Sequence, residues 1–120
     1  MQWEAEFHAD FDPEFDALPE EVQDELRAHA LLLEQFEPQL GRPRADTLKG
    51  SSHANRKELR FDADDDVWRV AFAFDPSRRA VLLVAGDKSG GSEKRFYRHL
   101  ISKADQRFDN HLARAGNERK

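Results

Sequence analysis

Basic side chains gather in the middle of the chain, between residues 42 and 60. They are Arg42, Arg44, Lys49, Arg56, Lys57 and Arg60, and only Asp46 and Glu58 oppose them there. Guanidinium and ammonium groups form strong hydrogen bonds with phosphate oxygens, and clusters of them are typical of proteins that bind nucleic acids. This stretch therefore indicates a surface suited to a phosphate backbone.

The charge of the chain is strongly polarised. Residues 1–41 contain twelve Asp or Glu and one Arg, whereas residues 42–120 contain eighteen Lys or Arg and twelve acids. The sequence pI of about 5.5 describes neither part, so it does not exclude a polyanionic partner. The acidic N-terminal part could lie across the basic surface, but we favour a solvated face, which is the usual role of such runs.

Other kinds of catalytic or binding site find little support. The chain has five His and no Cys, and the histidines do not have metal-ligand spacing. Ser51-Ser52-His53 lacks a nucleophile signature, and the glycines of residues 86–91 lack the spacing of a nucleotide-binding loop. We expect no metal, no cofactor and no nucleotide hydrolysis.

The length and composition indicate one cytoplasmic domain. A chain of 120 residues can bury one modest core, and no apolar run approaches the roughly 20 residues of a membrane span. The N-terminus shows no targeting pattern, and the absence of Cys is compatible with a reducing compartment. We assign residues 1–115 to the domain and residues 116–120 to a flexible tail.

The N-terminal third predicts a strand and a helix. Residues 2–7 alternate apolar and acidic side chains, which is the period of a half-buried strand. Residues 10–16 are acidic around Pro13 and predict a turn. A helix is expected from Pro19 to about Phe36–Gly41, with one apolar stripe of Leu18, Val22, Leu26, Ala30 and Leu33.

The remaining pattern predicts strands followed by a long helix. Residues 41–55 indicate an ordered loop, residues 58–61 and 68–74 a hairpin around a polar turn, and residues 80–85 an inner strand. Ser92 is a plausible N-cap for an amphipathic helix through residues 96–112. The expected fold class is α+β, a two-layer sandwich with an antiparallel sheet of about four strands and helices mainly on one face.

The hairpin predicts a pair of adjacent arginines. Side chains alternate along a strand, so the side chain of Arg60 points to the opposite face of the sheet from those of Leu59 and Phe61. With Asp64-Asp65 at the centre of the turn, Phe61 pairs with Trp68 and Arg60 with Arg69. We expect both arginines on an open sheet face.

These arginines could simply be solvated and paired with Glu58 or Asp62. We favour an anion-binding surface, because further cations come from neighbouring segments. They are Lys49, Arg56, Lys57 and Lys88. The basic side of the last helix, including Lys94, could extend this surface or be plain solvation, and the sequence does not separate the two.

Three stretches of the chain resemble the RelE/ParE toxin superfamily, in particular its phage-derived HigB-like branch found in type II toxin–antitoxin pairs. They are LGRPRADTLKGSSHANRKELRF (residues 40–61), WRVAFAFDPSRRAVLLVAGDKSG (residues 68–90) and FYRHLISKADQRFDNHL (residues 96–112). The resemblance implies a RelE-like α+β fold. It also implies an endoribonuclease that cuts messenger RNA in the ribosomal A site and so inhibits translation.

The implied reaction is attack of a ribose 2′-OH on the adjacent phosphate, which needs a base, an acid and cations. We assign Arg60 and Arg69 to phosphate stabilisation, Lys57 and Lys88 to base or electrostatic roles, and Tyr97 to base stacking or proton transfer. Lys57 shares the strand parity of Leu59, and Tyr97 could equally be a core aromatic. The RNA-binding residues are expected to be Arg42, Arg44, Lys49, Arg56 and Lys94.

An alternative within the same superfamily is a ParE-like toxin that inhibits DNA gyrase by binding, without RNA chemistry. The predicted cationic sheet face favours the nuclease. Either reading implies an antitoxin, expected to be a small helix-turn-helix protein that covers the basic surface or docks on the helices.

Overall fold

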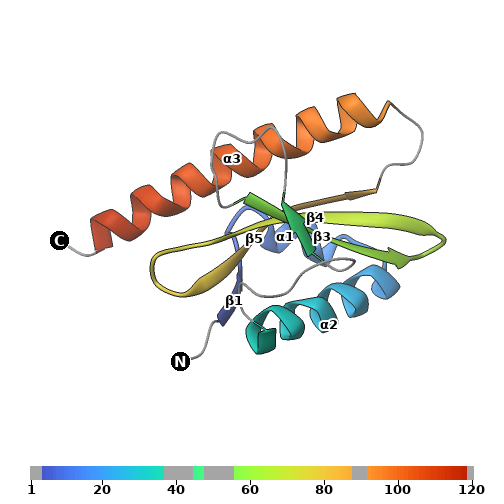
Figure 1. The fold of residues 1–120 in the computed structure, drawn as a ribbon, viewed down its shortest axis with the longest axis horizontal. Coiled ribbons are helices and arrows are strands. Elements are labelled where there is room, and N and C mark those ends of the chain that lie inside the picture. Colours follow the sequence, from blue (N-terminus) through green and yellow to red (C-terminus); the bar gives the residue numbers. More distant parts are fainter. Residues whose placement is uncertain (1–3, 37–44, 48–55, 88–91, 119–120) are drawn as a thin grey trace.

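A computed structural model describes residues 4–36, 45–47, 56–87 and 92–118. Its elements are β1 (Glu4–Phe7), α1 (Asp12–Asp16), α2 (Glu20–Phe36), β2 (Ala45–Thr47), β3 (Arg56–Ala63), β4 (Asp66–Phe74), β5 (Arg79–Asp87) and α3 (Glu93–Glu118). The described strands form one sheet in the order β1-β5-β4-β3-β2, antiparallel except that β1 pairs parallel with β5. The expected α+β class, with an N-terminal helix and a long C-terminal helix, is confirmed (Figure 1).

The β3–β4 hairpin has the predicted register. Phe61 pairs with Trp68 and Arg60 pairs with Arg69. The two residues between the strands, Asp64 and Asp65, have φ values of 52° and 60°, as a tight hairpin turn requires. Because Asp tolerates this left-handed conformation better than most residues, the acidic turn fixes which side chains share a face.

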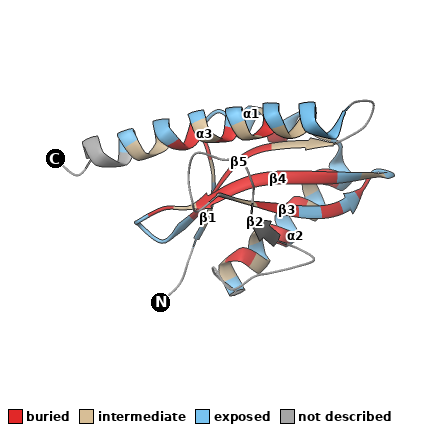
Figure 2. Ribbon diagram, turned by 45° about the horizontal axis from the view of Figure 1, so that its top comes forward, coloured by how far each residue is buried: buried red, intermediate tan, exposed pale blue. Residues whose placement is uncertain are grey.

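The expectation of two layers is wrong, because helices cover both faces of the sheet. In Figure 1, α2 lies on one side of the strands and α3 on the other. One core packs beneath α2 around Leu26, Leu59 and Phe72, and a second packs beneath α3 around Leu83 and Phe108. β4 is buried continuously from Trp68 to Ala73, which Figure 2 shows as an unbroken buried strand. The face that bears Arg69 is therefore covered and not open.

A bulge in β5 allows one strand to serve both cores. Val84 pairs with Ala71 and Leu82 with Phe72, which leaves Leu83 as an extra residue. Leu83 and Val84 consequently both belong to the core under α3. The carbonyl oxygen of Leu83 accepts a hydrogen bond from Nη1 of Arg107 at 2.7 Å, so a buried side chain satisfies the irregular backbone.

The structure also tests four predictions about individual segments of the chain. The acidic segment predicted as a turn contains α1, which begins at Asp12 next to Pro13. The loop predicted for residues 41–55 contains the short β2, whose three residues were too few to give a period. Ser92 is confirmed as the N-cap of α3, since its Oγ accepts the N–H of Arg95 at 3.4 Å. α3 continues to Glu118, so residues 116–118 of the predicted tail are helical.

Among the described residues, no helix is long and apolar enough to cross a membrane.

Candidate active site

Three polar side chains meet where β3 passes beneath the first turns of α3. Nη2 of Arg60 donates to Oε1 of Glu58 at 2.7 Å and lies 3.5 Å from the hydroxyl oxygen of Tyr97. The Tyr97 hydroxyl in turn donates to the same Glu58 oxygen at 3.3 Å. Glu58 and Arg60 come together because they are two residues apart on one strand and therefore share a face. The amphipathic helix α3 adds Tyr97 from above.

The members of this cluster differ sharply in exposure. Glu58 is only 4% exposed, whereas the side chain of Arg60 is 47% exposed. Oε2 of Glu58 is buried and has no hydrogen-bond partner among the described residues. The cluster is thus an acid at the bottom of the site, held by a cation that reaches solvent.

Arg69 lies directly across the hairpin from Arg60, but it is buried and not part of an open surface. It is 8% exposed, and its guanidinium carbon lies 5.8 Å from the ring centroid of Phe96 and 5.6 Å from that of Tyr97. These distances are typical of cation–π contacts. Its Nε and Nη1 groups have no hydrogen-bond partner within the described parts of the chain. The expectation of two exposed arginines therefore holds for Arg60 and is wrong for Arg69.

The local charges fix the protonation of Tyr97 and Arg60. Burial and the neighbouring charge of Glu58 raise the pKa of the Tyr97 hydroxyl above 10.0, although Arg69 and Arg60 oppose this. The hydrogen bond to Glu58 raises the already high pKa of Arg60. At neutral pH, Tyr97 is therefore a proton donor and Arg60 a permanent cation.

Of the other residues expected in the site, the two with described side chains, Lys57 and Lys94, are not gathered with this cluster. Lys57 pairs with Phe72 and lies on the α2 side of the sheet, as expected from its sharing a strand face with Leu59. Lys94 is exposed in the first turn of α3. Arg56 belongs to β3, but its side chain is outside the described part. Arg42, Arg44, Lys49 and Lys88 also lie outside the described residues.

Glu58 is the site residue that the sequence reasoning missed as a chemical group. It appeared there only as a possible ion-pair partner of Arg60. The signal that could have found it is its parity, because residues 58 and 60 must both face the side of Arg69. A carboxylate that accepts a hydrogen bond from a tyrosine and is neutralised by an arginine can accept a proton once the arginine turns to another anion.

Residues 13–109 match the family described as "Phage derived protein Gp49-like (DUF891)". The chain belongs to this family. Two relatives of the Gp49-like chain come from Mycobacterium tuberculosis. One, named "Putative toxin HigB3", is 50% identical over 82 residues, which are 68% of this chain and 69% of the relative. The other, named "Putative toxin HigB2", is 45% identical over 83 residues, which are 68% of this chain but 41% of the relative.

A solved structure resembles the fold of most of this chain. It is a mutant of the E. coli toxin RelE in the free state, with a TM-score of 0.59 over 86% of this chain and 97% of that chain. The two sequences are 12% identical, so this likeness concerns the fold alone. The expected RelE-like architecture is confirmed.

Proposed function

We propose that this Gp49-like protein is the toxin of a toxin–antitoxin pair and that it cleaves messenger RNA on the ribosome. The observation that carries the proposal is the cluster of Glu58, Arg60 and Tyr97, with Arg69 behind it. It supplies a proton acceptor, a proton donor and cations within one site. The relatives named as toxins and the RelE-like fold support the same class of activity.

The proposed reaction begins with Arg60. Its guanidinium is partly exposed and can turn from Glu58 to a phosphate of the RNA. The carboxylate of Glu58 then loses its neutralising partner and accepts the proton of the ribose 2′-OH. The 2′-oxygen attacks phosphorus and forms a cyclic phosphate, while the bond from phosphorus to the 5′-oxygen breaks.

Tyr97 is proposed to complete the reaction by giving its hydroxyl proton to the departing 5′-oxygen. The resulting phenolate would lie beside two cations, and the charge of Arg69 opposes the rise in the pKa of Tyr97 that burial and Glu58 cause. Arg69 is buried beneath α3, so its role is to hold the Tyr97 ring and supply positive potential. In this scheme Lys57 has no catalytic role, and Lys88 remains a prediction from the sequence.

The experiment is induced expression of the wild type and matched variants, with growth and message integrity as readouts. Arg60→Ala and Glu58→Gln should relieve growth arrest and abolish new 5′ ends within translated codons, mapped by primer extension. Arg79→Ala is the control, because Arg79 is an exposed arginine at the start of β5 and pairs with Glu6. Equal arrest in all four proteins would exclude the cluster as the active site. Intact messages with a DNA damage response would favour the gyrase-binding alternative.

The proposed partner is a cognate antitoxin that keeps the toxin silent. The tagged Arg60→Ala variant should co-purify with it when expressed together with its neighbouring genes. Recovery of the chain alone, together with normal growth on wild-type expression, would contradict the toxin assignment.

A further inference from the structure

The second half of β5 is an unpaired edge within the described structure. β1 pairs with β5 only from Arg79 to Leu82, whereas β5 continues to Asp87. On its other side, β5 pairs with β4 as far as Asp87. Residues 84–87 therefore have one edge without a neighbouring described strand. An extended peptide can form main-chain hydrogen bonds with such an edge.

The outer edge of β1, unlike the end of β5, has a backbone donor that a side chain already occupies. Oε2 of Glu34 accepts the N–H of Ala5 at 3.0 Å, so a side chain of α2 occupies a backbone donor of this strand. Charged side chains that block an edge are a common way to prevent strand addition. The end of β5 is the more accessible of the two for a partner strand.

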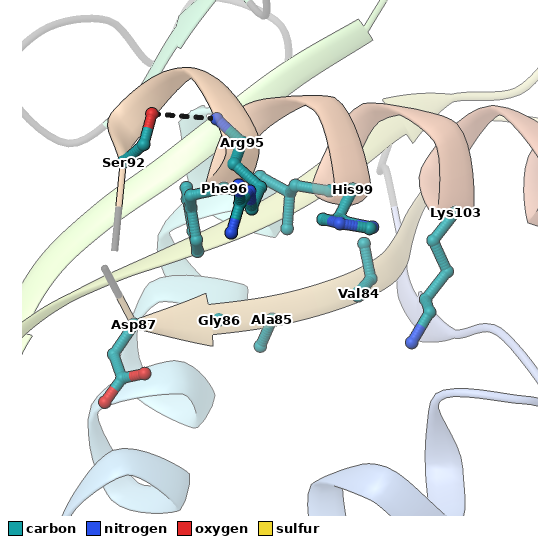
Figure 3. Close-up of a pocket in the computed structure, with 10 residues that line it drawn as sticks. Val84, Ala85, Gly86, Asp87, Ser92, Arg95, Phe96, His99 and Lys103 are labelled. Carbon is teal, nitrogen blue, oxygen red and sulfur yellow. Dashed lines mark hydrogen bonds between the residues drawn. The ribbon is translucent and has the colours of Figure 1, made fainter. Parts of the chain in front are cut away.

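A pocket of about 300 Å³ lies along the same residues of β5. Val84 to Asp87 form one wall, and the first turns of α3 form the other, as Figure 3 shows. Phe96 and Leu100 give this pocket an apolar lining, and Gly86 admits the Phe96 ring, whose Cε1 would be 2.9 Å from an added Cβ. Its size and lining suit an apolar side chain of a strand placed beside β5.

The helix wall of this pocket is basic. Arg95, His99 and Lys103 line it from α3, and Asp87 is the acidic residue among the lining side chains. In Figure 3, His99 and Lys103 project from the helix toward the strand. This charge complements an acidic segment.

Building on the proposed function, we propose that an extended acidic segment of the antitoxin adds to the sheet along residues 84–87 and places an apolar side chain in the pocket. RNA is the less suitable occupant, because a strand edge offers alternating backbone donors and acceptors that another backbone matches directly. Filling the pocket would also act on the active site. Phe96 lines the pocket, and its ring lies 5.2 Å from that of Tyr97 and within cation–π distance of Arg69.

The test uses the purified full chain and a fluorescent synthetic peptide of about nine alternating Asp and Val residues, a length typical of a strand. We expect saturable binding by fluorescence anisotropy, and no binding of a peptide in which Lys replaces Asp. Arg95→Glu/Lys103→Glu should weaken binding at least about tenfold. The control is Arg98→Glu/Arg114→Glu, which makes the same charge change at exposed positions of α3 that do not line the pocket, and it should change binding less than about twofold.

Hydrogen exchange of the complex distinguishes strand addition from simple charge attraction. Bound peptide should slow exchange of backbone amides within residues 84–87. The proposal is overturned if the acidic peptide does not bind, if both charge variants weaken it equally, or if these amides stay unprotected. Competitive displacement of the peptide by a short oligouridylate would also overturn it and assign the pocket to RNA. Because the assay contains no cleavage step, a chain without ribonuclease activity would still give a clear result.

Discussion

Nη2 of Arg60 donates to Oε1 of Glu58 at 2.7 Å, although Glu58 is buried and Arg60 reaches solvent. The pair follows from their spacing on β3, and the covering helix α3 makes it asymmetric. Removal of either partner therefore has different consequences, because a buried carboxylate without its cation is costly, whereas an exposed cation without its anion is not.

The first prediction is that Arg60→Ala destabilises the protein more than Glu58→Gln. Loss of Arg60 leaves the carboxylate of Glu58 with only the Tyr97 hydroxyl, which should cost about 1–3 kcal/mol. Glu58→Gln removes the charge and keeps the shape. The double variant should be more stable than the sum of the two single effects predicts, by about 1 kcal/mol. Urea unfolding of the four proteins measures this coupling, and strictly additive effects would contradict the ion pair.

The second prediction concerns the hydroxyl of Tyr97. Tyr97→Phe keeps the ring over Arg69 and removes the proton donor. It should lower the rate of RNA cleavage about 100-fold or more, which is the usual contribution of a general acid. The free energy of unfolding should change by no more than about 1.5 kcal/mol, the net value of one hydrogen bond. Cleavage at the wild-type rate in ribosome extracts would remove Tyr97 from the proposed mechanism.

The third prediction is that Arg107 is a structural residue. Its guanidinium binds both carboxylate oxygens of Glu14 and the carbonyl of Leu83. Arg107→Met should destabilise the protein by about 2–4 kcal/mol, because the bulge carbonyl and Glu14 both lose their partner. Arg114→Met, at an exposed position of the same helix, should change stability by less than about 0.5 kcal/mol. Thermal unfolding that ranks the two variants equally would contradict this role.

The fourth prediction is a pH dependence that originates at His8. Burial lowers the pKa of His8 below 6.5, opposed by Asp10 and reinforced by the charges of Arg107 and His111. Its neutral Nδ1 accepts the N–H of Asp10 at 3.0 Å. The unfolded state thus binds the proton more readily, and this contribution to stability is present above the unfolded pKa and decreases as the pH falls through about 6.5 toward the lower folded value.

His8→Asn should therefore flatten the fall in unfolding free energy between about pH 7.5 and pH 5.5. Glu14, whose pKa Arg107 lowers, also contributes at more acidic pH, but it is present in both proteins. Urea denaturation across this range measures the difference. Parallel pH profiles for wild type and variant would show that His8 does not titrate differently on unfolding.

Strand parity and turn chemistry were sufficient to predict the hairpin and its cross-strand pairs. Arg60 and Arg69 occupy the predicted register because the Asp64-Asp65 turn and the apolar alternation agree. Parity also placed Lys57 on the other side. Local patterns of this kind need no knowledge of what packs against the sheet.

The covered second face was beyond the prediction, although a signal was present. On the side of β4 that carries Arg69, the neighbouring residues are Ala71 and Ala73, which are small and apolar, whereas a solvated face would carry polar residues. Together with the long apolar stripe of α3, they indicate a helix that packs there. The burial of Arg69 and the contact of Glu58 with Tyr97 both depend on the packing of α3 against the sheet. The periodicity and composition of the sequence alone do not determine that packing.

The extra residue in β5 also decides which side chains lie beneath α3. If Leu83 paired with Ala71 in a regular ladder, every side chain from Val84 onward would exchange its facing helix. Gly86 would then turn away from Phe96, and Asp87 would point beneath α3. A change that draws Leu83 into the regular ladder should therefore disturb the floor under Tyr97 more severely than many substitutions in the active site itself.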